Sequence, residues 1–217
     1  MTSLFRRRRD RTDDRLVWHA AALLLAYPDD GLPERLRVVA EILGHLPHGA
    51  RDALAQTHRF LGETDPYTAA AEYVDTFDLG RRTTLYLTYW TAGDTRNRGR
   101  EILAFADAYR RAGVEPPRDE SADHLSVVLE FAALVDAAAG AGLLSAHRVP
   151  LDMLCAALAG SGSPYAPVLG AVCATLPAAS DQDAVRARQL ATAGPPAEAV
   201  GLEPFTLTVP PRRDGAH

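Results

Sequence analysis

Three carboxylates are the first side chains that could do chemistry. They are Glu72, Asp75 and Asp78, which recur every third residue and so share one helix face. Paired carboxylates can act as general acid and base, but an acidic helix face is more often only solvated. A further interpretation is a docking surface for a basic, apolar peptide, whose Arg or Lys side chains the acids would pair. On sequence alone, the solvated face and the peptide surface are equally well supported.

Aromatic and polar side chains from two nearby segments would complete such a peptide surface. Tyr73 and Phe77 lie on the same predicted helix as the acids, and Tyr86 and Tyr89 follow it. His124 could titrate near neutral pH and so stabilise or sense a peptide, although a histidine satisfied in the core or at a helix cap is the more common case. The candidate peptide-binding residues are Glu72, Tyr73, Asp75, Phe77, Asp78, Tyr86, Tyr89, Asp123, His124 and Glu130.

Three arginines, Arg96, Arg98 and Arg100, follow a predicted helix start. Asp94 comes after Gly93 and before a long amphipathic run, which is where an N-cap residue belongs. A helix N-terminus beside three arginines could hold a phosphate, but a capping carboxylate opposes an anion, so a solvated arginine face is favoured. The alternative is a small helical enzyme or ligand-binding protein that acts on a phosphorylated molecule through these arginines.

Other motifs that carry chemistry are missing from the sequence. The seven histidines are scattered, and no two lie four residues apart with a carboxylate in a metal-binding pattern. There is no nucleophile elbow, P-loop or dinucleotide fingerprint. Cys155 and Cys173 stand in apolar surroundings at a spacing that fits neither zinc nor a disulfide framework, so we predict buried free thiols. We therefore predict no catalytic residue, no metal and no permanently bound cofactor.

Helices must position these groups, because the hydrophobic periodicity along the chain is helical and no segment sustains a strand pattern. The brief alternation of Leu85, Leu87 and Tyr89 is interpreted as helix or turn. The helix that begins at Asp123 is apolar nearly all round, which places it at the centre of the fold. We expect an all-α fold, a single globular helical bundle. Its predicted helices span about residues 13–27, 33–43, 50–61, 67–79, 94–112, 123–135, 146–159, 164–176 and 181–190.

Composition and the two ends of the chain define the expected domain organisation. A chain of 217 residues with 47% hydrophobic residues suits one domain, and a net charge of −5 argues against bulk nucleic-acid binding. We expect a disordered basic tail at 1–12, a helical domain at 13–193 and a Pro-rich, mobile tail at 194–217 that contains an apolar island, Val200–Phe205. The apolar run Leu16–Tyr27 is too short to cross a bilayer and no cleavage site follows it, so we expect a cytoplasmic protein.

These segments together resemble a known family. Residues 73–103 look like the signature block of the nitrate reductase molybdenum cofactor assembly chaperones, the NarJ family, and the resemblance spans about residues 16–190. The chain departs from the family pattern at Ser121–Ala122, where a Leu-Pro pair is expected. The most specific matching pieces are the Gly93–Arg96 turn, the Arg98–Gly99 pair, Asp123–Leu125 with Val128–Phe131, and the opening segment Leu23–Pro28.

The resemblance implies an all-helical chaperone without enzymatic activity, with a fold shared by chaperones of other molybdoenzymes. The implied partner is the catalytic, molybdenum-containing subunit of respiratory nitrate reductase. The family binds that subunit's N-terminal segment, holds it until cofactor insertion and delays membrane docking. This favours the peptide-binding interpretation of the acidic face. It also keeps the phosphate alternative open, because the client's cofactor carries a pyrophosphate. We expect a monomer that does not insert into the membrane.

Overall fold

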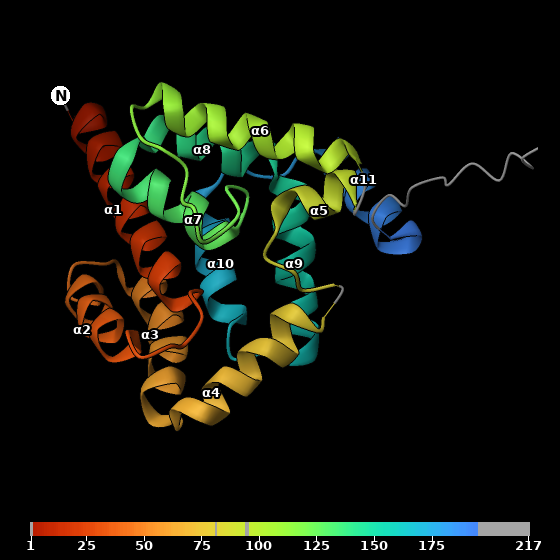
Figure 1. Cartoon of the computed structure of the whole chain (residues 1–217). Coiled ribbons are helices and arrows are strands. Elements are labelled where there is room, and N and C mark those ends of the chain that lie inside the picture. The colour runs from red at the N-terminus through yellow and green to blue at the C-terminus, as the bar shows by residue number, and fades with distance from the viewer. Residues whose placement is uncertain (1, 81, 94–95, 195–217) are drawn as a thin grey trace, which may run out of the picture.

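The computed structural model describes residues 2–80, 82–93 and 96–194, which form one bundle of helices (Figure 1). Within these ranges the only strand-like pairing is an isolated antiparallel bridge between Tyr86 and His124. The predicted all-α fold is therefore confirmed. The elements are α1 (Thr2–Leu24), α2 (Leu32–Leu43), α3 (His48–Glu63), α4 (Pro66–Tyr73), the π-helix η1 (Val74–Asp78), α5 (Leu87–Ala92), α6 (Arg96–Arg111), α7 (Leu125–Glu130), the π-helix η2 (Phe131–Val135), α8 (Ala137–Ala146), α9 (Arg148–Ser161), α10 (Ala166–Thr175) and α11 (Asp181–Ala193).

Helix α1 packs against α2, α3, α7, η2 and α10, so it is a central element of the core. Its indole at Trp18 donates from Nε1 to Thr175 Oγ1 at 2.8 Å, which ties α1 to the end of α10. The helix begins at Thr2, whereas the sequence predicted a disordered tail up to residue 12. Residues 2–24 contain no Gly or Pro, so nothing in this segment interrupts a helix. The helix ends at Leu24, ahead of the predicted end at Tyr27 and of Pro28.

Helix α7 lies in the core, but the prediction that its segment is buried nearly all round is only partly correct. Leu125, Val128 and Leu129 are fully buried. Leu134 and Val135, in contrast, are 53% and 44% exposed. The cause is the change from α-helix to π-helix after α7, because the wider turn rotates the following side chains away from the α-helical face.

Helix α8 was not predicted, because its Ala- and Gly-rich sequence has no contrast between apolar and polar faces. Asp136 caps it, since its carboxylate accepts from the backbone N–H groups of Ala138 and Ala139, both at 2.9 Å. Gly140 lets α8 approach η2 closely. A Cβ atom at this position would lie 2.3 Å from the Cβ of Ala132, well inside van der Waals contact.

Two stretches carry the candidate site: α4 with η1 and α5, and the loop that leads from α6 to α7 (Figure 1). Asp65 caps α4, accepting from the N–H groups of Tyr67 and Thr68 at 3.1 and 3.0 Å. The helix continues as η1 and stops before Gly80, where the sequence predicted a helix end. A Cβ atom at Gly80 would lie 2.6 Å from the carbonyl oxygen of Thr76, so the turn requires glycine.

Several predictions fall on residues outside the described ranges. These are the Asp94 cap of α6 and the C-terminal tail with its apolar island, Val200–Phe205. Within residues 2–80, 82–93 and 96–194, no helix combines the length and the hydropathy that a membrane crossing needs.

Candidate functional site

Two segments that are far apart in the sequence meet at Tyr86 and His124. Leu125 N donates to the Leu85 carbonyl oxygen at 2.9 Å, which holds the two backbones together beside the β-bridge. The rings of Tyr86 and His124 pack edge to face, with their centres 5.1 Å apart. The two sequence blocks that carry the family resemblance are therefore in direct contact in the fold.

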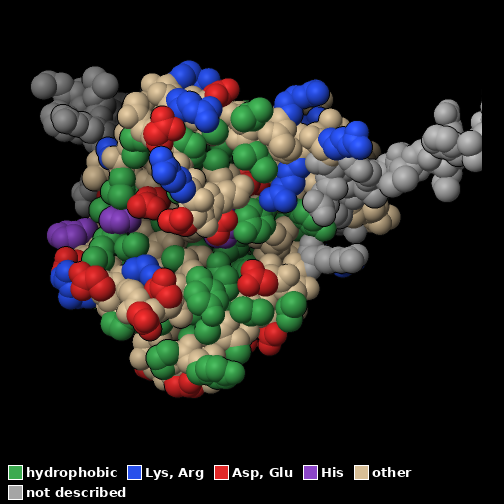
Figure 2. All heavy atoms as spheres, in the orientation of Figure 1, with side chains coloured by type: hydrophobic (Ala, Val, Ile, Leu, Met, Phe, Trp, Pro, Cys, Tyr) green, Lys and Arg blue, Asp and Glu red, His purple; other side chains and the backbone are tan. Residues whose placement is uncertain are grey.

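Two exposed carboxylates lie beside the partly exposed ring of Tyr86. Its hydroxyl donates to Glu120 Oε1 at 3.2 Å. Asp78, at the end of η1, interacts electrostatically with both Tyr86 and His124. Burial raises the pKa of Tyr86, and the neighbouring Glu120 raises it further. We call these four residues, Asp78, Tyr86, Glu120 and His124, the Tyr86 site. Figure 2 shows acidic side chains around apolar ones on the face between α4 and α7.

His124 is a buried member of the site, with 6% of its surface exposed. Its Nδ1 lies 2.7 Å from Ser126 Oγ, a hydrogen-bond distance. Burial lowers the pKa of His124, and the nearby carboxylates of Glu120, Asp123 and Asp78 only partly oppose that effect. The imidazole is therefore neutral at pH 7. Its geometry is that of a core histidine with a satisfied polar atom.

The buried side chain of Asp123 connects the two segments that form the site. The sequence predicted that Asp123 starts the helix and binds peptide, but α7 starts at Leu125 and Asp123 is completely buried. Its carboxylate accepts from Thr88 N at 3.1 Å, from Thr88 Oγ1 at 2.5 Å and from Ser121 Oγ at 2.5 Å. A buried carboxylate requires such partners, so Asp123 is inaccessible to a peptide and has a structural role.

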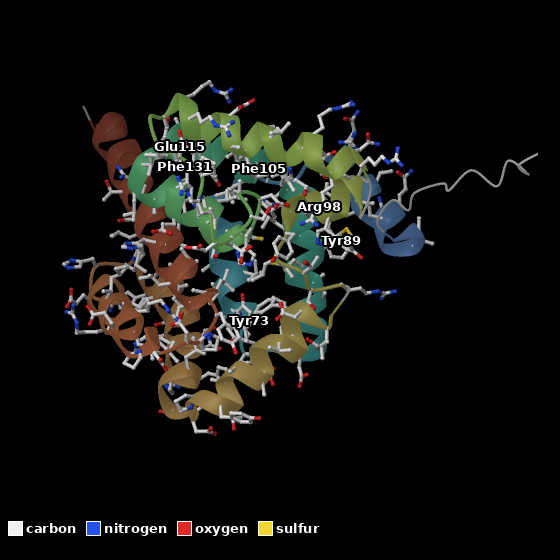
Figure 3. The ribbon with its side chains drawn as sticks, in the orientation of Figure 1. Tyr73, Tyr89, Arg98, Phe105, Glu115 and Phe131 are labelled. Atoms are coloured by element: carbon white, nitrogen blue, oxygen red, sulfur yellow. The ribbon has the colours of Figure 1, made fainter. Side chains whose placement is uncertain are left out.

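The three arginines of α6 do not converge on one ligand. The guanidinium of Arg98 lies 5.1 Å from the centre of the Tyr86 ring, and its Nη2 is 3.9 Å from Asp123 Oδ2. Arg98 therefore supports the Tyr86 ring from the side of α5, where Figure 3 shows it. Arg96 and Arg100 are exposed, and residues two positions from Arg98 on a helix point away from it. The geometry gives no support to a shared phosphate site for Arg96, Arg98 and Arg100.

Tyr73 and Phe77 are in the core, which corrects the expectation that they form part of an open surface. They are 5% and 4% exposed. The Tyr73 hydroxyl donates to the carbonyl oxygen of Leu25 at 3.2 Å. Both rings pack against Tyr165 of the α9–α10 connection, at centre distances of 6.0 and 4.9 Å. Figure 3 shows Tyr73 on the inner side of α4. Both rings anchor α4 and η1 to the core and are not accessible to a peptide in this structure.

The other predicted acids occupy separate positions. Asp75 is exposed on η1, and Glu72 is partly buried with a hydrogen bond of 3.2 Å from Thr76 Oγ1. Glu130 is exposed at the end of α7, where it interacts electrostatically with His19 of α1. Glu130 is therefore an exposed acid that is not part of the Tyr86 site.

Tyr89 is partly exposed on α5, and its ring lies 6.0 Å from that of Trp90. The sequence analysis missed one residue of the site, Glu120, and one residue of the network behind it, Thr88. Glu120 lies in a polar loop where no periodicity marks it, and Thr88 is a buried polar residue in an apolar segment. Only the pairing of the two segments shows their roles.

No group of three or more His, Cys, Asp or Glu side chains suited to a metal ion occurs in the part of the chain that the structure describes.

The arrangement suits amphipathic docking. The partly exposed ring can cover an apolar group, while the carboxylates of Asp78 and Glu120 can pair with cationic side chains. A basic peptide with apolar residues has both features.

Comparisons with known proteins agree with the resemblance seen in the sequence. A family model described as nitrate reductase delta subunit matches residues 43–170, which include the whole Tyr86 site. The nitrate reductase-like protein NarX of Mycobacterium tuberculosis is 55% identical over 160 residues, 74% of this chain but only 24% of that protein. This chain thus spans about a quarter of the NarX length.

Two relatives are named as chaperones. The probable nitrate reductase molybdenum cofactor assembly chaperone NarJ of Bacillus subtilis is 31% identical over 172 residues, 76% of this chain and 90% of the relative. The nitrate reductase molybdenum cofactor assembly chaperone NarJ of Escherichia coli is 34% identical over 113 residues, 51% of this chain and 48% of the relative. With a family model over more than half of its length and a relative that it covers almost completely, the chain belongs to the nitrate reductase delta subunit family, which includes the NarJ chaperones.

Proposed function

We propose that this chain is a cytoplasmic, monomeric assembly chaperone for the molybdenum-containing catalytic subunit of a respiratory nitrate reductase. It binds the N-terminal segment of the immature subunit, assists molybdenum cofactor insertion and delays membrane docking until assembly is complete. It acts without catalysis and without a cofactor of its own. Family membership and the names of the NarJ relatives support the identity of the client.

The observation that carries the peptide-binding proposal is the Tyr86 site. Its tyrosine ring is partly exposed, its hydroxyl donates to Glu120, and Asp78 interacts with it electrostatically. The buried carboxylate of Asp123 bonds the neighbouring Thr88 and so holds the two segments together. A preorganised surface of this kind binds with little loss of conformational entropy. The acids select a basic segment, and the ring takes up an apolar side chain next to it.

A chaperone of this kind needs only to bind the immature client more tightly than the mature client. An N-terminal segment that is accessible before assembly and buried afterwards meets this condition. Binding then ends when the segment takes its place in the assembled enzyme.

Calorimetric titration with a synthetic peptide of the client's N-terminal segment tests the proposal. Asp78→Asn and Glu120→Gln are each expected to weaken binding by about two- to five-fold and to reduce its salt dependence, because each removes one exposed charge. Asp107→Asn is the matched control, since Asp107 is an exposed acid on α6. Asp75→Asn tests how far the surface extends along η1.

The possible outcomes distinguish an error in the client assignment from an error in the location of the binding site. If the unmodified protein does not bind the peptide at either of two salt concentrations, the client assignment is wrong. If it binds, and both Asp78→Asn and Glu120→Gln leave the affinity unchanged at both concentrations, the peptide docks elsewhere.

A further inference from the structure

The two cysteines of the chain lie against each other. Cys155 on α9 and Cys173 on α10 are both free and partly exposed, and their Sγ atoms are 3.1 Å apart. The sequence predicted two unconnected buried thiols, because a spacing along the chain does not show that α9 and α10 fold back on each other. Gly162 makes this return possible: it ends α9 in the left-handed region, at φ 68°.

The contact between the two sulfur atoms favours a thiolate on one of them. The two thiols share a hydrogen bond, in which either sulfur can be the donor. A bond donated by Cys155 lowers the pKa of Cys173 and raises that of Cys155. Arg148 also lowers both thiol pKa values, whereas burial and Asp152 raise them. Arg148 is held in place by its ion pair with Asp152, at 2.8 Å, and by a hydrogen bond to the Pro177 carbonyl oxygen. With Cys155 as the donor, Cys173 is the more reactive nucleophile of the pair.

We propose that Cys155 and Cys173 are a redox-sensitive pair, which hydrogen peroxide converts into a disulfide that joins α9 to α10. The Cys173 thiolate attacks one peroxide oxygen, the O–O bond breaks, and hydroxide leaves. The sulfenic acid formed on Cys173 is then attacked by the Cys155 sulfur, which forms the S–S bond and displaces a second hydroxide. The two thiol protons neutralise both hydroxides. In total, two thiols are oxidised by two electrons and one peroxide is reduced to two waters.

The position of the pair favours closure over further oxidation. The two sulfur atoms are already 3.1 Å apart, so a sulfenic acid on Cys173 meets Cys155 without a large movement of the helices. The new bond would enclose the segment that carries Tyr165, whose ring packs against Tyr73 and Phe77. Oxidation therefore restrains the segment that carries Tyr165, on which Tyr73 and Phe77 pack.

Peroxide treatment of the reduced full-length protein tests the inference directly. The chain contains only these two cysteines, so the free-thiol count should fall from two to zero and the intact mass by two hydrogens. Both cysteines lie in one tryptic peptide, residues 149–186, because no Lys or Arg separates Arg148 from Arg186. Additional chymotryptic cleavage after Tyr165 should yield two peptides that stay joined until a reductant is added.

The melting temperature provides a second measurement. A disulfide that closes this loop is expected to raise the melting temperature of the oxidised protein by roughly 4–10 °C, and reduction should reverse the rise. The Cys155→Ser and Cys173→Ser variants should gain oxygen or form intermolecular dimers, with no such rise. The inference is wrong if the unmodified protein keeps both thiols, takes up oxygen without a cross-link, or forms mainly intermolecular disulfides.

Discussion

At the scale of single residues, burial decides which acids are structural and which can bind. Asp123 is completely buried and accepts three hydrogen bonds from Thr88 and Ser121, with Arg98 nearby. Asp78 and Glu120 have the same charge but are exposed. A carboxylate with satisfied, buried oxygen atoms stabilises the fold, whereas an exposed carboxylate is available to a partner. The Ser121 hydroxyl contributes to this network at the position where the chain departs from the family pattern.

The first prediction concerns this buried carboxylate. Asp123→Ala should lower the free energy of unfolding by about 3–5 kcal/mol, because it leaves the buried donors of Thr88 and the charge of Arg98 without their acceptor. Chemical denaturation measures the change. Glu130→Gln, at an exposed acid near the end of α7, should change stability by less than about 0.5 kcal/mol. Equal losses in both variants would contradict the structural role assigned to Asp123.

At the scale of elements, close contacts between helices depend on small residues and on the two π-helices. The π-helix η1 carries Phe77 into the core and Asp78 to the surface. The π-helix η2 rotates Leu134 outward. Helix α8 packs against η2 through Gly140, where the backbone of Ala132 leaves no room for a side chain. These positions are set by packing between elements and have no signature in local periodicity.

Two glycines of α8 provide a matched test of this packing. Gly140→Ala should destabilise the protein by about 1–3 kcal/mol, because the added methyl group overlaps Ala132 and forces the helices apart. Gly142→Ala places its methyl group where no atom lies within 4 Å, so it should stabilise by about 0.4–1 kcal/mol through the unfolded state. Thermal or chemical denaturation of both variants would show the opposite signs. A stabilising Gly140→Ala would mean that α8 does not contact η2 in this way.

At the scale of the whole molecule, three histidines couple folding to pH. Burial lowers the pKa of His19, His124 and His147 below the reference value of 6.5. They belong to α1, the start of α7 and the α8–α9 junction, so their effect covers most of the bundle. Between 6.5 and the lowered folded-state values, the unfolded chain binds more protons than the native one. The contribution of these histidines to stability is therefore fully present above pH 6.5 and is lost as the pH falls through this window.

The pH dependence can be tested at His124. The protein's melting temperature should fall between about pH 7 and about pH 5, and the fall should be smaller in His124→Gln, which removes one of the three proton-linked groups. His48→Gln replaces an exposed histidine at the start of α3 and serves as the control. Thermal melts at several pH values measure the slope. An unchanged slope in His124→Gln would contradict the neutral, buried state of this imidazole.

The sequence alone determined the properties that depend on neighbours in the chain. The helical periodicity predicted an all-α bundle, and Gly80 marked a real helix end, whereas α1 ends at Leu24, before the end that Pro28 predicted. The blocks at residues 73–103 and 123–131 also carried the family resemblance. These signals are local, because propensity, capping and turn geometry act over a few residues.

Only the tertiary structure decided which of the candidate side chains are accessible and which are paired. Packing of α4 and η1 onto Tyr165 buried Tyr73, and the β-bridge beside Tyr86 placed Asp123 inside and Glu120 outside. The contact between Cys155 and Cys173 arose in the same way. Each of these outcomes depends on two segments that are distant in sequence, and burial of a polar or aromatic group depends on what the second segment brings. A periodicity computed on one segment contains no information about its partner, so the fold class was predictable and the composition of the site was not.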